Sequence, residues 1–264
     1  MKVLIKGAGD LASGIGLRLH RSGFQVLMTE IPVPTTVRRT VAFSRAVYEG
    51  KATVEDVEGI LCDSLDLAME AFLNDQVAVM VDETCQVREL WKPDAVVDGI
   101  IAKKNLGTTI TDAPIVVGVG PGFTAGEDCH VVVETKRGHD LGRCIWNGSA
   151  VPNTGIPGNI GGFDKERIIR ASADGSFRGA VSIGDLVKKG DLLGWCKEEP
   201  VYALIDGVVR GLLQDGVLVF RGMKAGDIDP RGVVSSCFTV SDKALAIGGG
   251  VLEAILSMKK RGAV

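Results

Sequence analysis

The glycine-rich turn at residues 7–12 constrains the fold of this chain more than any other feature. A short apolar segment, 2–6, runs directly into Gly7-Ala-Gly-Asp-Leu-Ala12, and a helical stretch follows. In a G-x-G-x-x-A pattern the first glycine permits a tight turn, and the second lets the backbone approach a pyrophosphate. The free N–H groups of the following helix face that anion. The pattern predicts a phosphate-binding turn that contains Gly7, Gly9, Asp10 and Ala12.

Charged residues after the next segment extend this prediction. A second apolar segment, 24–29, is followed by Glu30, at the spacing where a carboxylate accepts hydrogen bonds from ribose hydroxyls. Arg38 and Arg39 follow and are candidates for a further phosphate, as in NADP or a molybdopterin. The alternatives are a Rossmann-like turn without a nucleotide and a solvated helix face for the two arginines.

Composition excludes several classes of protein. The chain has 264 residues, 45% of them apolar, and a net charge of −3 with both signs interspersed. Such a charge balance provides no basic face for nucleic acid, and no apolar run reaches the roughly 18 residues of a membrane span. The chain begins in a strand-like segment rather than a signal peptide, and none of its cysteines forms C-x-x-C. We therefore expect a cytoplasmic protein with free thiols and no metal site.

The order of predicted elements indicates an α/β domain followed by an all-β domain. Over 1–125, apolar segments alternate with helical ones, which predicts a Rossmann-like, doubly wound parallel sheet. We expect a β-rich domain over 126–240, and over 241–264 a C-terminal helix packing on the first domain. The predicted strands are 2–6, 24–29, 52–57, 77–82, 95–98 and 115–119, and the predicted helices 10–22, 36–48, 63–74 and 84–90.

The β-rich domain contains an internal repeat. Residues 174–190 align with 206–222 at an offset of 32, and eight of the seventeen positions are identical. Two copies of one β unit predict a pseudo-two-fold sandwich. The sequence of the repeat resembles that of the biotinyl/lipoyl barrel-sandwich hybrid, so this domain is expected to adopt that fold.

Three side chains are candidates for chemistry. Cys144 lies near Lys136, Arg137 and Arg143 in the sequence, a setting that favours a thiolate. The other two candidates are Cys129 and His139. Each has a plainer reading, as a buried structural cysteine or a surface histidine.

The chain resembles the accessory (maturation) proteins of the selenium-dependent molybdenum hydroxylase system. The resemblance rests on Gly7 to Ala12, Met28 to Pro32, Arg38 to Ser44, Val47 to Gly50, Glu134 to His139, Pro152 to Gly162 and Lys224 to Arg231. It implies an accessory protein that binds a phosphate-bearing cofactor, either a molybdopterin or a dinucleotide, and acts on a molybdenum hydroxylase partner.

Two other functions remain open at this point. One is an NAD(P)-dependent oxidoreductase, although no convincing proton donor stands out. The other is a non-catalytic module whose β domain docks a partner enzyme. The sequence therefore leaves open whether the chain is an enzyme, and whether its ligand is NAD(P) or a molybdopterin.

Overall fold

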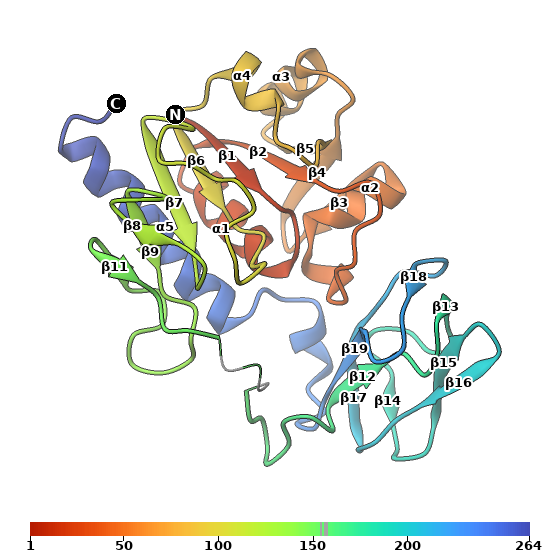
Figure 1. The fold of residues 1–264 in the computed structure, drawn as a ribbon. Helices are drawn as coiled ribbons and strands as arrows, with labels where there is room; N and C mark the ends of the chain where they lie inside the picture. The colour runs from red at the N-terminus through yellow and green to blue at the C-terminus, as the bar shows by residue number, and fades with distance from the viewer. Residues whose placement is uncertain (154, 156–157) are drawn as a thin grey trace. The chain divides into compact units, whose positions relative to one another are not determined.

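The computed structural model describes residues 1–153, 155 and 158–264, and its contacts divide the chain into two units (Figure 1). The first unit comprises Met1–Pro34, Ala42–Thr154 and Val240–Val264. The second comprises Thr35–Val41 and Gly155–Thr239. Domain boundaries after residues 125 and 240 were expected from the sequence, and they remain a prediction about which parts of the chain fold independently. In the described part of the chain, no helix is both long and apolar enough to cross a membrane.

A nine-stranded mixed sheet forms the centre of the first unit. Its order is β10-β9-β7-β6-β1-β2-β5-β4-β3; the strands from β9 to β4 run parallel, and β10 and β3 pair antiparallel at the two edges. A two-stranded sheet of β8 and β11 accompanies it. The bounds are β1 Lys2–Lys6, β2 Gln25–Glu30, β3 Lys51–Val54, β4 Val57–Leu61, β5 Val77–Val81, β6 Ala95–Asp98, β7 Ile115–Val119, β8 Thr124–Ala125, β9 Val131–Val133, β10 Cys144–Ile145 and β11 Gly148–Ser149.

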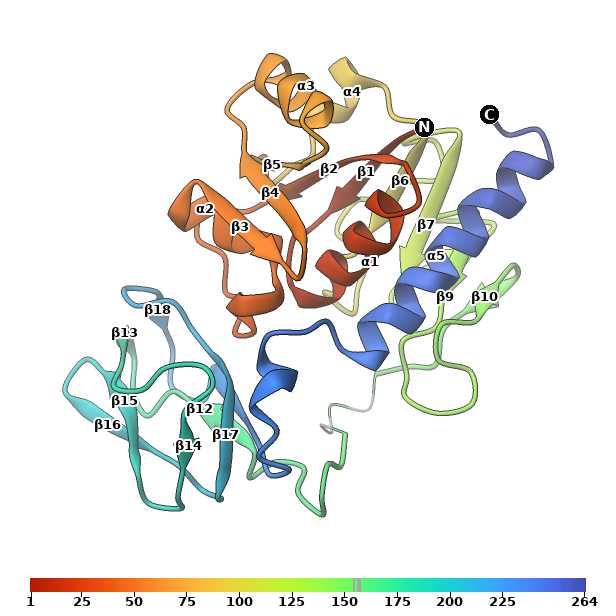
Figure 2. The same ribbon diagram turned by 180° about the vertical axis from the view of Figure 1, so that it is seen from behind.

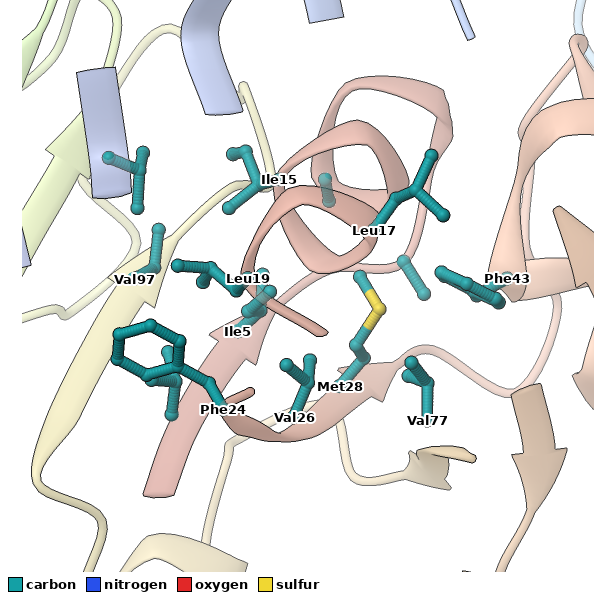
Figure 3. Close-up of a cluster of buried hydrophobic side chains, with 14 of the residues drawn as sticks. Ile5, Ile15, Leu17, Leu19, Phe24, Val26, Met28, Phe43, Val77 and Val97 are labelled. Carbon is teal, nitrogen blue, oxygen red and sulfur yellow. The ribbon is translucent and has the colours of Figure 1, made fainter. Parts of the chain in front are cut away.

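Helices cover both faces of this sheet. Successive residues of a strand point to opposite faces, and in the central strands both sets of residues are apolar. In β1, Ile5 packs in one buried cluster with helices α1 (Asp10–His20) and α5 (Asp242–Lys260), as Figure 3 shows in part. Leu4 packs in another cluster with α3 (Leu65–Leu73) and α4 (Val87–Trp91). Burial on both faces explains why the central strands read as unbroken apolar runs. Short helical segments η2 (Phe43–Arg45) and α2 (Ala46–Glu49) precede β3.

Helices α1 and α5 lie side by side and run parallel (Figure 2). A Cβ built on Gly14 of α1 would lie 2.6 Å from the Cβ of Ala244, and one built on Gly248 would lie 3.1 Å from the Cβ of Arg18. Residues four positions further along α1 thus contact residues four positions further along α5, as expected for parallel helices. Small residues at these crossings let the backbones approach closely, and both helices begin at the same edge of the sheet.

The second unit consists of two antiparallel four-stranded sheets with orders β12-β19-β17-β14 and β16-β15-β13-β18. Buried apolar side chains from both sheets form one core around Phe177 and Leu193. Two short helical segments, η1 (Arg39–Val41) and η3 (Val234–Cys237), also belong to this unit. The strand bounds are β12 Ile168–Arg170, β13 Gly175–Gly179, β14 Leu186–Val187, β15 Leu192–Cys196, β16 Glu199–Tyr202, β17 Gly207–Leu212, β18 Leu218–Val219 and β19 Lys224–Asp229.

Hydrogen bonds in the second unit recur at the offset of 32 found in the sequence. The Asp174 carboxylate accepts from the N–H of Arg221 at 2.6 Å, and the Asp206 carboxylate accepts from that of Lys189 at 2.8 Å. Strand β13 of the first copy pairs with β18 of the second, and β17 of the second pairs with β14 of the first. Because each copy supplies strands to the other, neither copy contains a complete sheet.

The fold class predicted from the sequence, a Rossmann-like parallel sheet with a barrel-sandwich-hybrid domain, is wrong. The large sheet is mixed because β3 and β10 reverse direction at its edges, and no helix separates β6 from β7 or β7 from β9. The strands of the second unit form two antiparallel sheets of four rather than a biotinyl/lipoyl-like domain. The strand predicted at 52–57 is instead the β3–β4 hairpin, which turns at Glu55 with a φ of 57°.

The glycine triplet of α5 offers a direct test of the close packing. A Cβ on Gly250 would fall on the carbonyl oxygen of Gly142, whereas a Cβ on Gly249 would meet no atom within 4 Å. We predict that Gly250→Ala lowers the free energy of unfolding by about 2 kcal/mol through overpacking. We predict that Gly249→Ala raises it by up to about 1 kcal/mol through helix propensity. Denaturant unfolding of both variants checks this, and equal effects would contradict the packing described.

Candidate functional site

Several loops with charged residues begin at the carboxyl edge of the parallel strands in the first unit. The loops that follow β1, β2, β6 and β9 all begin at this edge because these strands are parallel. Helices α1 and α5 also begin there. Ligands of open α/β sheets bind at the carboxyl ends of the strands, so this edge is the first place to look for a site.

The glycine-rich turn is held by hydrogen bonds to the end of β2. Gly7 has a φ of +88°, and its N–H donates to the Thr29 carbonyl at 2.8 Å. The Glu30 carboxylate accepts from the N–H of Ala8 and from that of Ile31, both at 2.9 Å. Burial raises the pKa of Glu30, and these two hydrogen bonds partly offset that effect. Glu30 therefore binds the turn through one oxygen and the start of its own loop through the other, a role different from the predicted contact with a ribose.

The start of α1 receives no side-chain hydrogen bond from its N-cap residue. Gly9 precedes the helix in an extended conformation, with φ −66° and ψ 179°, and supplies no side-chain cap. The first N–H groups of a helix have no partner within the helix, and they carry the positive end of its dipole. Asp10 occupies the first helical position, and Ala12 is buried against Gly99. Gly7, Gly9, Asp10 and Ala12 thus come together at this edge.

A buried ion pair fixes the loop that follows β6. The Lys6 ammonium donates to the Thr108 hydroxyl at 2.6 Å and lies 3.6 Å from the Asp98 carboxylate. The Thr108 hydroxyl donates to that carboxylate at 2.6 Å. All three residues are buried, so the hydrogen bonds compensate for the desolvation of both charges. Within this loop Lys103 is exposed and has a φ of 64°, the left-handed region that non-glycine residues rarely adopt.

Charged side chains from several segments act on Lys243 near the start of α5. Arg137, in the loop after β9, makes a bidentate ion pair with Asp242 at the start of α5, at 2.6 and 2.9 Å. The neighbouring Lys243 is half-buried, and its pKa is lowered first by burial and then by Arg137. Lys103 adds to this lowering, whereas Asp10 and Glu134 oppose it.

Glu134 is fully engaged with the main chain. One of its carboxylate oxygens accepts from the N–H groups of Thr135 and Lys136, both at 2.7 Å, and the other accepts from that of Val151 at 2.8 Å. Its side chain is buried. Like Glu30, this carboxylate holds a loop of the edge in place.

Arg38 and Arg39 belong to the second unit, whereas the glycine-rich turn with which the sequence grouped them belongs to the first. Arg38 donates to the carbonyls of Ser236 and Thr239, both at 3.2 Å. Arg39 donates to the Leu212 carbonyl at 2.7 Å. The helix predicted over 36–48 is wrong, because these contacts hold 35–41 against strand β17 and the segment around η3.

The three candidates for chemistry have separate surroundings. Cys129 is buried among apolar side chains, and burial raises its pKa to about 11. Burial likewise raises the pKa of Cys144 to about 11, with Glu253 adding to the effect, and its thiol donates to the Gly250 carbonyl at 3.2 Å. His139 is exposed. Both thiols are therefore protonated at neutral pH, and we assign no reaction to them.

Sequence reasoning did not select Lys6, Thr108, Lys103 or Lys243. Lys6 could have been selected from the sequence, since a lysine inside a strand expected to be buried requires a polar partner. Lys243 carries no local signal, because only the packing of α5 against α1 brings it to this edge. Among the described residues, no group of three or more His, Cys, Asp or Glu side chains is arranged to hold a metal ion.

Comparisons with known proteins give one strong similarity. The chain is 52% identical over 260 residues to the uncharacterized protein YqeB of Escherichia coli (strain K12). The aligned region covers 98% of this chain but 48% of YqeB, so the chain spans about half the length of that relative. No protein-family model matches the chain.

Solved structures show only weak similarity. A succinylglutamate desuccinylase/aspartoacylase from Rhodobacter sphaeroides has a TM-score of 0.26 and 14% identity, and the match covers 86% of this chain and 84% of that one. An aspartoacylase family protein from Mesorhizobium loti has a TM-score of 0.27 and 10% identity, with the same coverage. Similarities at this level assign neither a fold nor an activity to this chain.

These findings correct the resemblance to molybdenum hydroxylase accessory proteins. No family model supports it, and the relative is not named for molybdenum or selenium chemistry. The corresponding function in maturation is withdrawn, together with the NAD(P)-dependent oxidoreductase and the docking module. The structure adds a physical reason against a dinucleotide, because the Glu30 carboxylate binds the turn itself.

The role of Glu30 generates a stability prediction. We predict that Glu30→Ala lowers the free energy of unfolding by about 2 kcal/mol, since it leaves two backbone donors without their acceptor. Burial raises the folded-state pKa of Glu30, so its contribution is largest below the unfolded-state pKa of about 4.3 and falls as the pH rises through the folded-state value. Denaturant unfolding at pH 4 and pH 7 should show the larger loss at pH 4. The exposed Glu49→Ala serves as control, and an equal loss in both variants would refute the role.

The burial of Cys144 generates a prediction about reactivity. With a pKa of about 11, its thiolate fraction at pH 8 is about 0.1%, and it rises about tenfold for each pH unit. We expect the iodoacetamide alkylation rate at Cys144 to keep rising between pH 7.5 and pH 9.5, as followed by peptide mass spectrometry. A rate that levels off near pH 8.5, as for a solvated thiol, would show that the site is not desolvated.

Proposed function

We propose that the first unit binds a small anionic ligand, of the carboxylate or phosphate class, at the carboxyl edge of its sheet. The observation that carries this proposal is that Lys103 and Arg137 act electrostatically on Lys243. Lys243 in turn acts on Asp10, in the first turn of α1, a helix whose N-cap Gly9 supplies no side-chain cap. Cations and helix N–H groups stabilise the same kind of ligand, so their contributions add.

The acidic residues of the edge limit the size of the charge that binds. Glu134 and Glu30 use their oxygens for backbone N–H groups, and Asp242 pairs with Arg137. Asp10 remains close to Lys243 and opposes an anion. This balance supports a ligand with one or two negative charges rather than a polyphosphate.

Gly7, Gly9, Asp10 and Ala12 form the main-chain part of the proposed site. Arg38 and Arg39 are left out because their donors serve carbonyl oxygens of the second unit. A cytoplasmic location also stays a proposal, supported by six cysteines that are all free.

Substitution of the lysines tests the charged part of the site. We expect Lys103→Ala and Lys243→Ala each to weaken binding of inorganic phosphate or succinate about tenfold, because each removes a charged hydrogen-bond donor. Isothermal titration calorimetry on the full chain measures this. Lys259→Ala is the matched control, since Lys259 is an exposed lysine at the other end of the same helix. Unchanged affinity in both site variants would refute the proposal.

Substitution of Gly9 separates binding from stability. The extended conformation of Gly9 suits an N-cap residue, so we expect Gly9→Asp to raise the free energy of unfolding by a few tenths of a kcal/mol. The new carboxylate would occupy the N–H groups at the start of α1, and anion binding should be lost. Calorimetry and denaturant unfolding of the same sample measure the two effects. A variant that binds phosphate as tightly as the original chain would show that the helix start is not part of the site.

A further inference from the structure

A cavity of about 380 Å³ opens in the second unit between strands β12 and β16. Each of these strands lies at the edge of one of the two four-stranded sheets. The Ser172 hydroxyl donates to the Glu199 carbonyl at 2.9 Å and links the two edges. Three core residues that are at most 4% exposed, Ile169, Val201 and Ile228, line the cavity. Its volume lies in the range of small-molecule sites, about 300–1,000 Å³.

The cavity lies between equivalent strands of the internal repeat. The offset of 32 carries β12 onto 200–202 of β16, and it carries β15 onto β19. Each of the two edge strands pairs with a strand of the other copy, β12 with β19 and β16 with β15. Four pairs of lining residues are related by the same offset: Ile168 and Pro200, Ile169 and Val201, Arg170 and Tyr202, and Ser172 and Leu204. Both copies therefore contribute the same positions to one cavity.

The two copies differ in chemistry at these equivalent positions. Where β12 and the residues after it supply Arg170 and Ser172, β16 and the residues after it supply Tyr202 and Leu204. Lys165 adds a second cation before β12. Tyr202 and Leu204 are 52% and 56% exposed, so much of their apolar surface is not covered by the chain itself. A cavity with one cationic side and one apolar side suits an amphipathic molecule.

The unused hydrogen-bonding groups indicate the charge of that molecule. Within the described residues, the Lys165 ammonium and the Tyr202 hydroxyl make no hydrogen bond. Arg170 donates to the Gly222 carbonyl at 2.9 Å through one nitrogen, and a guanidinium has five N–H donors. The acidic lining residue, Glu166, already accepts from the N–H of Asp164 at 3.3 Å. Because unused donors predominate, the matching polar group is a negatively charged acceptor.

We propose that this cavity binds a small carboxylic acid with an apolar body. The carboxylate lies toward Lys165 and Arg170, and the apolar body packs on Tyr202 and Leu204 over the exposed part of the core. This site belongs to the second unit, and it is independent of the anion site proposed for the first unit.

Three probes with one apolar chain and different head groups test the proposal: octanoate, 1-octanol and octylammonium. Each is titrated by calorimetry into the full chain with phosphate in excess, which occupies the anion site of the first unit. We expect octanoate to bind about tenfold more tightly than octanol, because its carboxylate gains charged hydrogen bonds. Octylammonium should bind most weakly. Lys165→Ala should remove most of the advantage of octanoate and leave the affinity for octanol unchanged.

A matched pair of leucine variants tests the location. Leu204→Trp places a larger side chain at the cavity and should abolish octanoate binding. Leu218→Trp is the control, since Leu218 is an exposed leucine of the same unit that does not line the cavity. Denaturant unfolding checks that both variants fold.

Three results would overturn the proposal. The first is that none of the probes binds saturably. The second is tighter binding of octylammonium than of octanoate, which would refute the assigned charge. The third is octanoate binding that persists in Leu204→Trp, or that the excess phosphate abolishes, because either would place the octanoate outside this cavity.

Discussion

The close parallel packing of α1 and α5 is the constraint on which the candidate site depends. Gly14, Ala244 and Gly248 remove the side chains that would otherwise separate the two helices. Parallel helices place their positive ends together, which is electrostatically unfavourable when nothing negative lies nearby. Asp10 and Asp242, in the first turn of each helix, reduce that cost. The edge therefore combines a fixed positive potential with acidic residues that moderate it.

The carboxylates of this edge divide into two groups with different tasks. Glu30 and Glu134 are buried or half-buried and accept hydrogen bonds from main-chain N–H groups, so they shape loops. Asp10 and Asp242 lie at helix starts and face cations instead. A carboxylate that already satisfies two or three N–H groups has little capacity left for a ligand. This division leaves the lysines as the side chains of the edge with capacity for a ligand.

The sequence predicted the local features of this site and missed the distant ones. The turn at Gly7 and Gly9 was predictable because its pattern lies in consecutive residues. Arg38 and Arg39 follow β2 in the chain, yet their donors serve the second unit, and no local pattern encodes that exchange. The mixed character of the sheet was missed because β10 has two residues and β3 has four. Strands this short carry too little alternation to reveal their direction.

The inclusion of residues 35–41 in the second unit limits which segments of the gene can be recombined. The N–H of Leu212 donates to the Val37 carbonyl at 2.7 Å, and a side chain at Gly211 would lie 3.1 Å from that same oxygen. The second unit is therefore built from two separate stretches of the gene. A recombination event that transferred only residues 155–239 would leave Leu212 without its acceptor, and it would leave behind a segment whose arginines had lost their carbonyls. The two stretches are thus bound to evolve together, and Gly211 and Val37 are positions at which substitutions in one stretch restrict those allowed in the other.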